Sequence, residues 1–358
     1  MQDRINKVRT LLEERNLDGL LITNPFNRRY ISGFTGTAGS VLITANEAFF
    51  ITDFRYTDQA KQETEGYTIV QAERQPVNTW VELIKQHKIK MLGFEQDHVT
   101  VGQYTAWKEA FAQASCRLEP TSGLVERLRL IKDEKEIKLI KEAVRIADET
   151  FAHILTVIKP GLTERAIAHE IEMTMRQMGA SSSSFDIIVA SGVRSALPHG
   201  VASDKVIENG ELVTLDFGAV YKGYVSDLTR TIAIGKPDPK LKEIYEICLE
   251  AQKHGVAHVK AGMTGREADA LCREVIKSKG YGPQFGHSTG HGIGLEIHEG
   301  PTLSMRSDVL LQAGMVVTVE PGIYITGLGG VRIEDDVLIK ESGAEILTQS
   351  PKELLIID

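Results

Sequence analysis

A five-residue segment of this chain occurs twice, and both copies stand in the same surroundings. Lys159-Pro-Gly-Leu-Thr163 returns as Lys260-Ala-Gly-Met-Thr264. A long helical pattern precedes each copy, a second helical pattern follows it, and a β-rich stretch with a glycine-bearing turn comes next. The repeat predicts a duplicated unit of helix, helix and hairpin, with the two hairpins side by side in one pseudo-symmetric sheet. A simpler interpretation is that the two threonines are helix N-caps.

Each predicted hairpin carries two acidic residues at near-equal distances from its turn. Asp216 and Asp227 flank a turn centred on Tyr221, and Glu320 and Glu334 flank the turn of the second hairpin. Residues that face each other in a hairpin have Cβ atoms about 5 Å apart, so two like charges there are destabilising unless a cation lies between them. We therefore expect the four carboxylates to converge on a shared site with about two divalent cations.

Three histidines lie between the two hairpins in the sequence and are candidates to complete this site. They are His287, His291 and His298, and glycines around the first two allow tight turns. Carboxylate-dominated ligation favours Mn²⁺, Fe²⁺ or Co²⁺ over metals that seek thiolates. Two such ions about 3.5–4 Å apart can bridge a hydroxide and polarise a carbonyl, as in aminopeptidases and phosphatases.

The chain has 358 residues, 42% of them hydrophobic and 25% charged, which is enough for two domains with a large buried core. Its net charge of −8 gives no electrostatic reason to expect a nucleic-acid partner. No apolar stretch approaches about 20 residues, so we expect neither a secretion signal nor a membrane span. The three cysteines are scattered and form no CxxC pair, which is typical of a reducing compartment. We therefore expect the protein to be cytoplasmic.

Residues 1–123 alternate helical and strand patterns, which predicts an α/β N-terminal domain. The expected helices cover residues 3–16, 56–65, 79–87 and 101–114, and the expected strands cover 19–23, 40–44 and 49–52. A loop with Pro120 and Gly123 follows, and we place the domain boundary there. Residues 124–358 are expected to form an α+β domain that contains the repeat, with helices over 134–158, 163–178, 239–259 and 264–279.

Several motifs of the second domain resemble those of the pita-bread metallopeptidases, and within that group the Xaa-Pro peptidases, aminopeptidase P and prolidase. The motifs are Leu197-Pro-His-Gly200, Asp216-Phe-Gly218, Asp227-Leu-Thr229, Gly290-His-Gly-Ile-Gly294, Val319-Glu-Pro-Gly322 and Val331-Arg-Ile-Glu-Asp335. The segments Asn24–Gly36 and Thr52–Tyr56 resemble the creatinase/prolidase N-terminal domain. The resemblance covers nearly the whole chain.

The resemblance implies five metal ligands at positions of this chain that match the family pattern. They are Asp216, Asp227, His291, Glu320 and Glu334. In that pattern Asp227 and Glu334 bridge two ions, Asp216 completes one ion, and His291 with Glu320 completes the other. Mn²⁺ is the expected metal, with Co²⁺, Fe²⁺ or Zn²⁺ as alternatives. The implied reaction is attack of a metal-bridging hydroxide on the carbonyl that precedes a proline, with Glu320 as proton shuttle.

Further positions match the family's substrate-facing and supporting residues. His199 and His298 are expected to hydrogen-bond substrate carbonyls, and Arg332 to steady the site, with charge balance for Glu334 as the alternative role of Arg332. The substrate pocket is expected to include Phe185, His287 and Tyr324. We expect Asp335 and Asp336 to be neighbouring turn residues and not ligands. His254 and His258 have ligand-like spacing on a helical pattern, but no acidic partner, and are expected on a solvated helix face.

One departure from the family pattern concerns the length of the substrate. Many prolidases carry an arginine that holds the carboxylate of a dipeptide, and Thr302 stands at that position here. We therefore favour an aminopeptidase that accepts longer Xaa-Pro peptides, with a strict Xaa-Pro dipeptidase as the alternative. Less favoured are a metal-free creatinase, a non-catalytic binding protein and a methionine aminopeptidase. The family also implies a homodimer and short proline-containing peptides as substrates.

Overall fold

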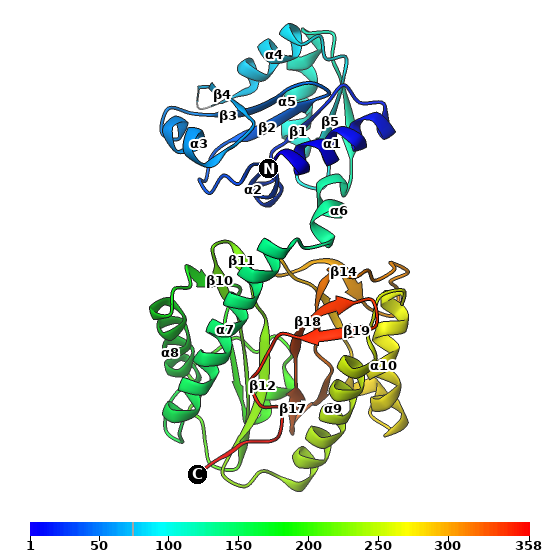
Figure 1. Ribbon diagram of the computed structural model, residues 1–358. Helices are drawn as coiled ribbons and strands as arrows, with labels where there is room; N and C mark the ends of the chain where they lie inside the picture. The colour runs from blue at the N-terminus through cyan, green and yellow to red at the C-terminus, as the bar shows by residue number, and fades with distance from the viewer. Residues whose placement is uncertain (74) are drawn as a thin grey trace. The chain divides into compact units, whose positions relative to one another are not determined.

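The computed structural model describes residues 1–73 and 75–358 of the chain (Figure 1). The chain divides into two compact units, Met1–Arg129 and Leu130–Asp358. Helix α6 (Leu124–Leu130) spans this division and begins directly after residue 123. The domain boundary expected at residue 123 stays a prediction. None of the described helices is both long enough and apolar enough to cross a membrane.

The first unit is an α/β domain built on one mixed sheet with the strand order β4-β3-β2-β1-β5-β6. The strands are β1 (Gly19–Ile22), β2 (Ser40–Thr44), β3 (Ala48–Thr52), β4 (Thr68–Gln71), β5 (Met91–Glu95) and β6 (Arg117–Thr121). The helices are α1 (Gln2–Arg15), α2 (Pro25–Ser32), α3 (Thr57–Glu63), α4 (Val77–Gln86) and α5 (Val101–Ala112). The predicted fold class is confirmed here, and each expected helix and strand is present within a few residues.

Local sequence signals explain where these helices begin. The Asn24 side chain accepts from the backbone of α2, whose first residue is proline, and Gly33 ends the helix in the left-handed region. In α5 the side chains of Thr100 and Gln103 form a capping box. The uniformly buried strands β1, β2 and β3 carry no period-two pattern because both of their faces are covered.

The second unit consists of two copies of one arrangement. The first copy contains α7 (Glu134–Val157), α8 (Glu164–Gln177), β8 (Ile188–Ser191), β9 (Glu211–Phe217) and β12 (Leu228–Ile234). The second contains α9 (Pro239–His258), α10 (Gly265–Ser278), β13 (Gly290–Gly292), β15 (Val316–Val319) and β18 (Asp335–Lys340). In Figure 1, α7 and α8 cover the strands on one side, and α9 and α10 cover them on the other. The α+β class and the predicted duplication are therefore confirmed.

Shorter strands complete the second unit. They are β7 (Ser182–Ser183), β10 (Ala219–Tyr221), β11 (Tyr224–Val225), β14 (Glu299–Leu303), β16 (Gly322–Ile325), β17 (Gly329–Arg332), β19 (Gly343–Ile346) and β20 (Ile356–Ile357). The sheets have the orders β20-β12-β9-β8, β14-β13-β15-β18-β19 and β11-β10-β7, and β16 pairs with β17. The short helices η1 (Gly192–Ala196) and η2 (Gly282–Gln284) lie in loops.

The repeated five-residue segment has the same conformation in both copies. Thr163 caps α8 and Thr264 caps α10, and each threonine also forms an isolated antiparallel bridge to an extended segment. Gly161 and Gly262 both have a positive φ, at 91° and 86°. The helix-cap interpretation and the duplication are thus both correct, because the threonine caps are part of the repeated unit.

The first carboxylate hairpin has a different register from the one predicted. Tyr221 pairs with Tyr224, and further from the turn Asp216 pairs with Thr229. The prediction that Asp216 faces Asp227 across the turn is therefore wrong. Asp227 and Thr229 are two residues apart and point to the same face, so the two aspartates are diagonal neighbours, which still lie within reach of each other.

The cause of this register is the position of the turn. Lys222 and Gly223 both have positive φ values, 47° and 87°, as the two central residues of a tight hairpin turn require. The sequence analysis centred the turn on Tyr221, which precedes this pair. A one-residue error in the centre of a turn shifts the pairing partner by two residues.

The second carboxylate hairpin has the predicted register. Val319 pairs with Asp335 on one side of the acidic pair, and Gly322 pairs with Arg332 on the other. Glu320 and Glu334 lie between these two ladders at matching positions, so they are equidistant from the turn, as predicted.

The two hairpins lie side by side, as the repeat predicts, but they do not share one sheet as expected, because their ladders belong to the separate sheets β20-β12-β9-β8 and β14-β13-β15-β18-β19. The Glu334 amide donates to the Thr229 carbonyl over 3.1 Å, and the Thr231 hydroxyl donates to the Arg332 carbonyl over 2.9 Å. Both hairpins are almost fully buried between the two helix pairs. This contact brings the acidic side chains of both copies to one place.

Candidate metal centre

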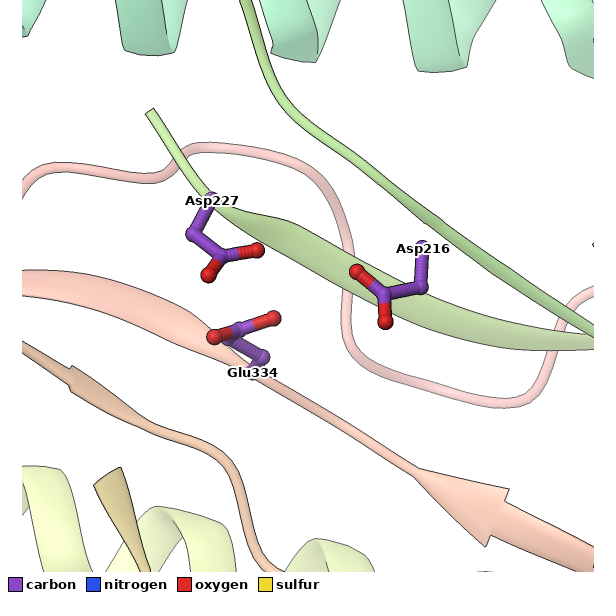
Figure 2. A group of neighbouring side chains, drawn as sticks. All are labelled: Asp216, Asp227 and Glu334. Carbon is purple, nitrogen blue, oxygen red and sulfur yellow. The ribbon is translucent and has the colours of Figure 1, made fainter. Parts of the chain in front are cut away.

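Three carboxylates from the two hairpins meet in the interior of the second unit. Oxygens of Asp216, Asp227 and Glu334 all lie within 4.8 Å of one another. Figure 2 shows the three carboxyl groups pointing into the space between the two hairpins. Asp216 is on β9, Asp227 directly precedes β12, and Glu334 lies between β17 and β18.

His291 and Glu320 extend this cluster. Nε2 of His291 lies 3.3 Å from Oε1 of Glu320 and 3.6 Å from Oδ2 of Asp227. Nδ1 of His291 lies 3.1 Å from the carbonyl oxygen of Gly292, which can only accept, so Nδ1 carries the hydrogen. The lone pair of Nε2 is therefore directed at the carboxylates, which is the tautomer that a metal ligand needs.

Burial in the absence of a cation makes the ionised form of these carboxyl groups costly. Burial raises the pKa values of Asp227 and Glu334 well above their usual range, and the neighbouring carboxylates raise them further. Burial also raises the pKa of Glu320 to about 8, although the nearby Arg332 guanidinium opposes this shift. A divalent cation between these groups would reverse the effect by favouring their charged forms.

The side chains of the cluster fit a divalent cation. Oε2 of Glu334 accepts from the Thr229 hydroxyl over 2.7 Å, whereas Oε1 of Glu334 is buried without a hydrogen-bond partner among the described residues. A buried carboxylate oxygen with no donor calls for an explanation, and an ion supplies one. Several carboxylates and one imidazole, with no thiolate, suit Mn²⁺, Fe²⁺ or Co²⁺.

Arg332 is fixed by the hairpin strands next to the cluster. Its guanidinium donates to Asp216 over 2.5 Å, to the Tyr324 hydroxyl over 2.8 Å and to the Thr229 hydroxyl over 3.2 Å. The described contacts thus connect Arg332 with Asp216 and not with Glu334, whose charge it was alternatively expected to balance. Its side chain is 4% exposed, so these hydrogen bonds are shielded from water.

A chain of hydrogen bonds continues from Arg332 to His287. Tyr324 accepts from Arg332, so its own hydrogen is free to be donated to Nε2 of His287 over 2.8 Å. Nδ1 of His287 donates in turn to the Ser288 carbonyl over 2.8 Å. Burial and the Arg332 charge lower the pKa of His287 to about 4, so its ring is neutral at pH 7. The orientation of the His287 ring is fixed by its neighbours on both sides.

The cluster forms the floor of a cavity of about 690 Å³. All five expected ligands line it, together with further expected site residues, namely Phe185, His199, His287, His298 and Arg332. His199 and His298 are exposed, and the His298 ring lies 4.5 Å from that of His291. Tyr324 is absent from the lining of this cavity and stands behind His287 and Arg332. The structure therefore brings the other expected site residues together around one cavity, and Tyr324 contacts two of them, His287 and Arg332.

A register change places Phe185 and the exposed Asp186 at the cavity wall. Ser183 pairs with Ala219, but Ile188 pairs with Asp216, so four residues on one strand oppose two on the other. Such bulges redirect side chains beside functional sites. Asp186 was not predicted, since nothing in the sequence distinguishes it from other surface acids.

Several residues that support the cluster were missed or misjudged from the sequence. Asp335 and Asp336 are not turn residues, because both are fully buried in β18. Oδ2 of Asp336 accepts from the Asp227 amide over 3.0 Å. Oδ1 of Asp335 accepts from Arg230 over 2.9 Å, and Arg230 is also buried. Charged residues within otherwise apolar strand patterns were the available signal for these positions.

Comparison with known proteins agrees with this architecture in both units. The model of metallopeptidase family M24 matches residues 138–341, and that of the creatinase/prolidase N-terminal domain matches residues 4–131. An Xaa-Pro dipeptidase from Pyrococcus furiosus is 42% identical over 357 residues, which cover 99% of this chain and 100% of the relative.

Two solved structures illustrate the similarity in three dimensions. An Xaa-Pro dipeptidase from Bacillus anthracis has 59% sequence identity and a TM-score of 0.97, covering 99% of both chains. An X-Pro aminopeptidase from Thermotoga maritima has 44% identity and a TM-score of 0.89, covering 96% of this chain and 98% of the other. Both names describe proteins that act on a bond involving proline.

Proposed function

The chain belongs to metallopeptidase family M24, with a pita-bread catalytic unit and a creatinase/prolidase N-terminal domain, and on this premise we propose that it hydrolyses Xaa-Pro peptide bonds. The proposed substrates are short peptides with proline as their second residue. The metallopeptidase chemistry is supported above all by one observation, that all five expected metal ligands line a single cavity. The preference for proline is supported by the names of the relatives.

Membership of the family implies divalent metal ions, and we propose that two are bound. Mn²⁺ is the proposed metal, with Co²⁺, Fe²⁺ or Zn²⁺ as alternatives. The five residues that would hold these ions are Asp216, Asp227, His291, Glu320 and Glu334. When bound, such ions polarise the substrate carbonyl and lower the pKa of a water molecule.

Glu320 is the proposed proton carrier. Its Oε1 accepts from the Thr318 hydroxyl over 3.2 Å, which orients the carboxyl group towards the cavity. This carboxylate would take a proton from the attacking water and deliver it to the proline nitrogen as the bond breaks. An amide nitrogen is a very poor leaving group as an anion, so the proton must reach the proline nitrogen as the bond breaks.

His199 and His298 are proposed to bind the substrate carbonyl oxygens. Both rings are exposed at the cavity, and each can donate a hydrogen bond to an oxygen on which negative charge develops. The pKa of His298 is lowered by burial and, to a smaller extent, by the nearby His291. Its ring is therefore neutral at neutral pH and donates from one nitrogen. Arg332 is proposed to hold Asp216 in place, while Phe185, His287 and Tyr324 form and support the wall around the substrate.

The length of the substrate is judged from two observations, the cavity lining and the names of the relatives, and these favour different answers. The cavity lining of the described residues contains one lysine or arginine, Arg332, which already binds Asp216 and Tyr324. With Thr302 in place of the arginine of many prolidases, this lining offers no free cation to bind the carboxylate of a dipeptide. This favours an aminopeptidase that acts on longer peptides. The strict dipeptidase remains the second candidate, because two of the relatives described above are Xaa-Pro dipeptidases.

The decisive experiment compares four assays on one chelator-treated preparation. We expect hydrolysis of Ala-Pro-Ala to be lost without metal, to return with Mn²⁺ or Co²⁺, and to exceed hydrolysis of Ala-Ala-Ala. No hydrolysis with any divalent metal would overturn the proposal and support a binding protein on this fold. A preference of more than about tenfold for Ala-Pro over Ala-Pro-Ala, or about 1.4 kcal/mol, would favour the strict dipeptidase.

We further propose a homodimer in the cytoplasm, as the family resemblance and the scattered cysteines favour. Light scattering of the purified protein at several concentrations measures the first of these expectations. A mass equal to one 39.5 kDa chain at all concentrations would contradict it.

A further inference from the structure

Two exposed histidines on α9 form a pair that the proposed function does not use. His254 and His258 are one helical turn apart, and neither lines the cavity of the metal centre. Their ring centroids are 4.3 Å apart, and the ring planes are inclined by 33°. The two imidazoles therefore lie next to each other on one face of the helix, and both are accessible to solvent.

Hydrogen bonds define the tautomer of both rings. Nδ1 of His254 lies 2.9 Å from the carbonyl oxygen of Leu271 on α10, and Nδ1 of His258 lies 2.8 Å from the carbonyl oxygen of His254. Carbonyl oxygens only accept, so each Nδ1 carries a hydrogen, and in the neutral ring Nε2 is the nitrogen with the lone pair. Among the residues that the structure describes, neither Nε2 has a hydrogen-bond or ion-pair partner.

We propose that His254 and His258 form a second metal site, which binds a single Ni²⁺, Cu²⁺ or Zn²⁺ ion through their two Nε2 atoms. Two histidines four residues apart on a helix present their nitrogens to the same ion. A backbone carbonyl that holds the Nδ1 hydrogen fixes the ring and increases the basicity of the ligand nitrogen, and here both rings have one. Water would complete the coordination, since the pair is exposed.

The chemistry of this pair differs from that of the cluster between the hairpins. Its two donors are neutral imidazoles without a carboxylate, and imidazole suits Zn²⁺, Cu²⁺ and Ni²⁺, whereas carboxylates suit Mn²⁺. The two sites should therefore be occupied by different ions. This inference does not depend on the peptidase activity, because His254 and His258 are outside the proposed catalytic residues.

The test uses tag-free, full-length protein saturated with Mn²⁺ and titrated with Ni²⁺ in a calorimeter. We expect the natural protein to bind one Ni²⁺ more per chain than the double variant His254→Gln/His258→Gln, and each single variant to bind that ion at least tenfold more weakly. His153→Gln is the matched control, since His153 is a half-buried helical histidine that contacts Glu170, and this variant should bind Ni²⁺ like the natural protein.

A second titration, with Cu²⁺ in place of Ni²⁺, distinguishes the histidine pair from the carboxylate cluster. The Cu²⁺ that the natural protein binds in excess of the double variant should give an electron paramagnetic resonance spectrum with coupling to two nitrogen atoms. The double variant should lack this signal. Peptidase activity with Mn²⁺ should be equal in all variants. Equal Ni²⁺ stoichiometry and affinity in the natural protein and the double variant would overturn the proposal.

Discussion

Glu320 has two proposed roles, as a metal ligand and as the proton carrier. The change Glu320→Gln keeps the shape of the side chain and an oxygen for the Thr318 hydroxyl, but removes the ability to accept a proton. We expect kcat on Ala-Pro-Ala to fall by about 10²–10⁴-fold, the usual contribution of a general acid or base, with a smaller change in KM.

Metal content decides how that result is interpreted. Elemental analysis of the Glu320→Gln protein separates a lost proton carrier from a lost ligand. The control is Glu341→Gln, because Glu341 is an exposed residue directly after β18 and does not line the cavity. A kcat within tenfold of the natural value, with the metal retained, would remove Glu320 from the mechanism.

Arg332 is the second residue whose geometry makes a specific prediction. A lysine in its place retains the charge, but a single ammonium cannot replace three guanidinium nitrogens that bind Asp216, Tyr324 and Thr229. We expect Arg332→Lys to lower kcat at least tenfold and to destabilise the fold by about 1–3 kcal/mol, because buried partners lose their hydrogen bonds. Steady-state kinetics and urea unfolding measure both. Unchanged kcat would indicate that Arg332 has no positioning role.

At the scale of the elements, Arg230 connects the two hairpins and the C-terminal segment. Its guanidinium donates to the carbonyls of Thr229, Glu334, Ser350 and Pro351 and to the carboxylate of Asp335. All of its five donor hydrogens are therefore used inside the protein. The position of Glu334 in the cluster is consequently tied to residues near the end of the chain.

We expect Arg230→Met to lower the unfolding free energy by about 3–5 kcal/mol, because four carbonyls lose a buried donor and Asp335 keeps only Lys352 and Gln252 as partners among the described residues. The matched control is Arg165→Met, because Arg165 forms an exposed ion pair with Asp204 in the same repeat and should contribute nothing measurable. Urea unfolding of both variants provides the comparison. Equal effects of the two substitutions would contradict the structural role of Arg230.

At the scale of the whole molecule, the buried carboxyl groups make stability depend on pH and metal together. Asp227, Glu320 and Glu334 have pKa values above their usual range in the folded protein, whereas in the unfolded chain they titrate near 4. As the pH rises above about 4, the unfolded chain loses these protons first. The metal-free fold is therefore destabilised progressively, and for Glu320 this continues to about pH 8.

We expect the Tm of the chelator-treated protein to fall between pH 5.5 and 8, and the Tm of the Mn²⁺-saturated protein to change much less. The increase in Tm caused by Mn²⁺ should therefore grow with pH, because the ions stabilise the charged carboxylates. Differential scanning calorimetry at several pH values measures this. In Glu320→Gln the dependence should be weaker near pH 8, and a metal-free Tm that rises over this range would refute the explanation.

The sequence by itself determined most helices of this protein and the candidate ligands at its site. Helix periodicity, capping residues and glycine-bearing turns are local signals, so most helices and the strands β1, β2 and β3 were predicted within a few residues. The short helices α2 and α6 and the strands β4, β5 and β6 were not predicted. The repeat predicted that the two hairpins lie side by side, because identical units pack in the same way. The family resemblance then selected Asp216, Asp227, His291, Glu320 and Glu334 as candidate ligands, and all five line one cavity.

Only the tertiary structure decided which atoms face each other. The turn at Lys222 and Gly223 made Asp216 and Asp227 diagonal neighbours, since a backbone turn sets the register of a hairpin more strongly than the pairing of its side chains. Asp335 and Asp336 became buried partners of Arg230 and of the Asp227 amide, because contacts across more than a hundred residues of sequence leave no local pattern. The tautomers of the histidines and the chains of hydrogen bonds were likewise decided by the tertiary structure, because they form only once the strands have met.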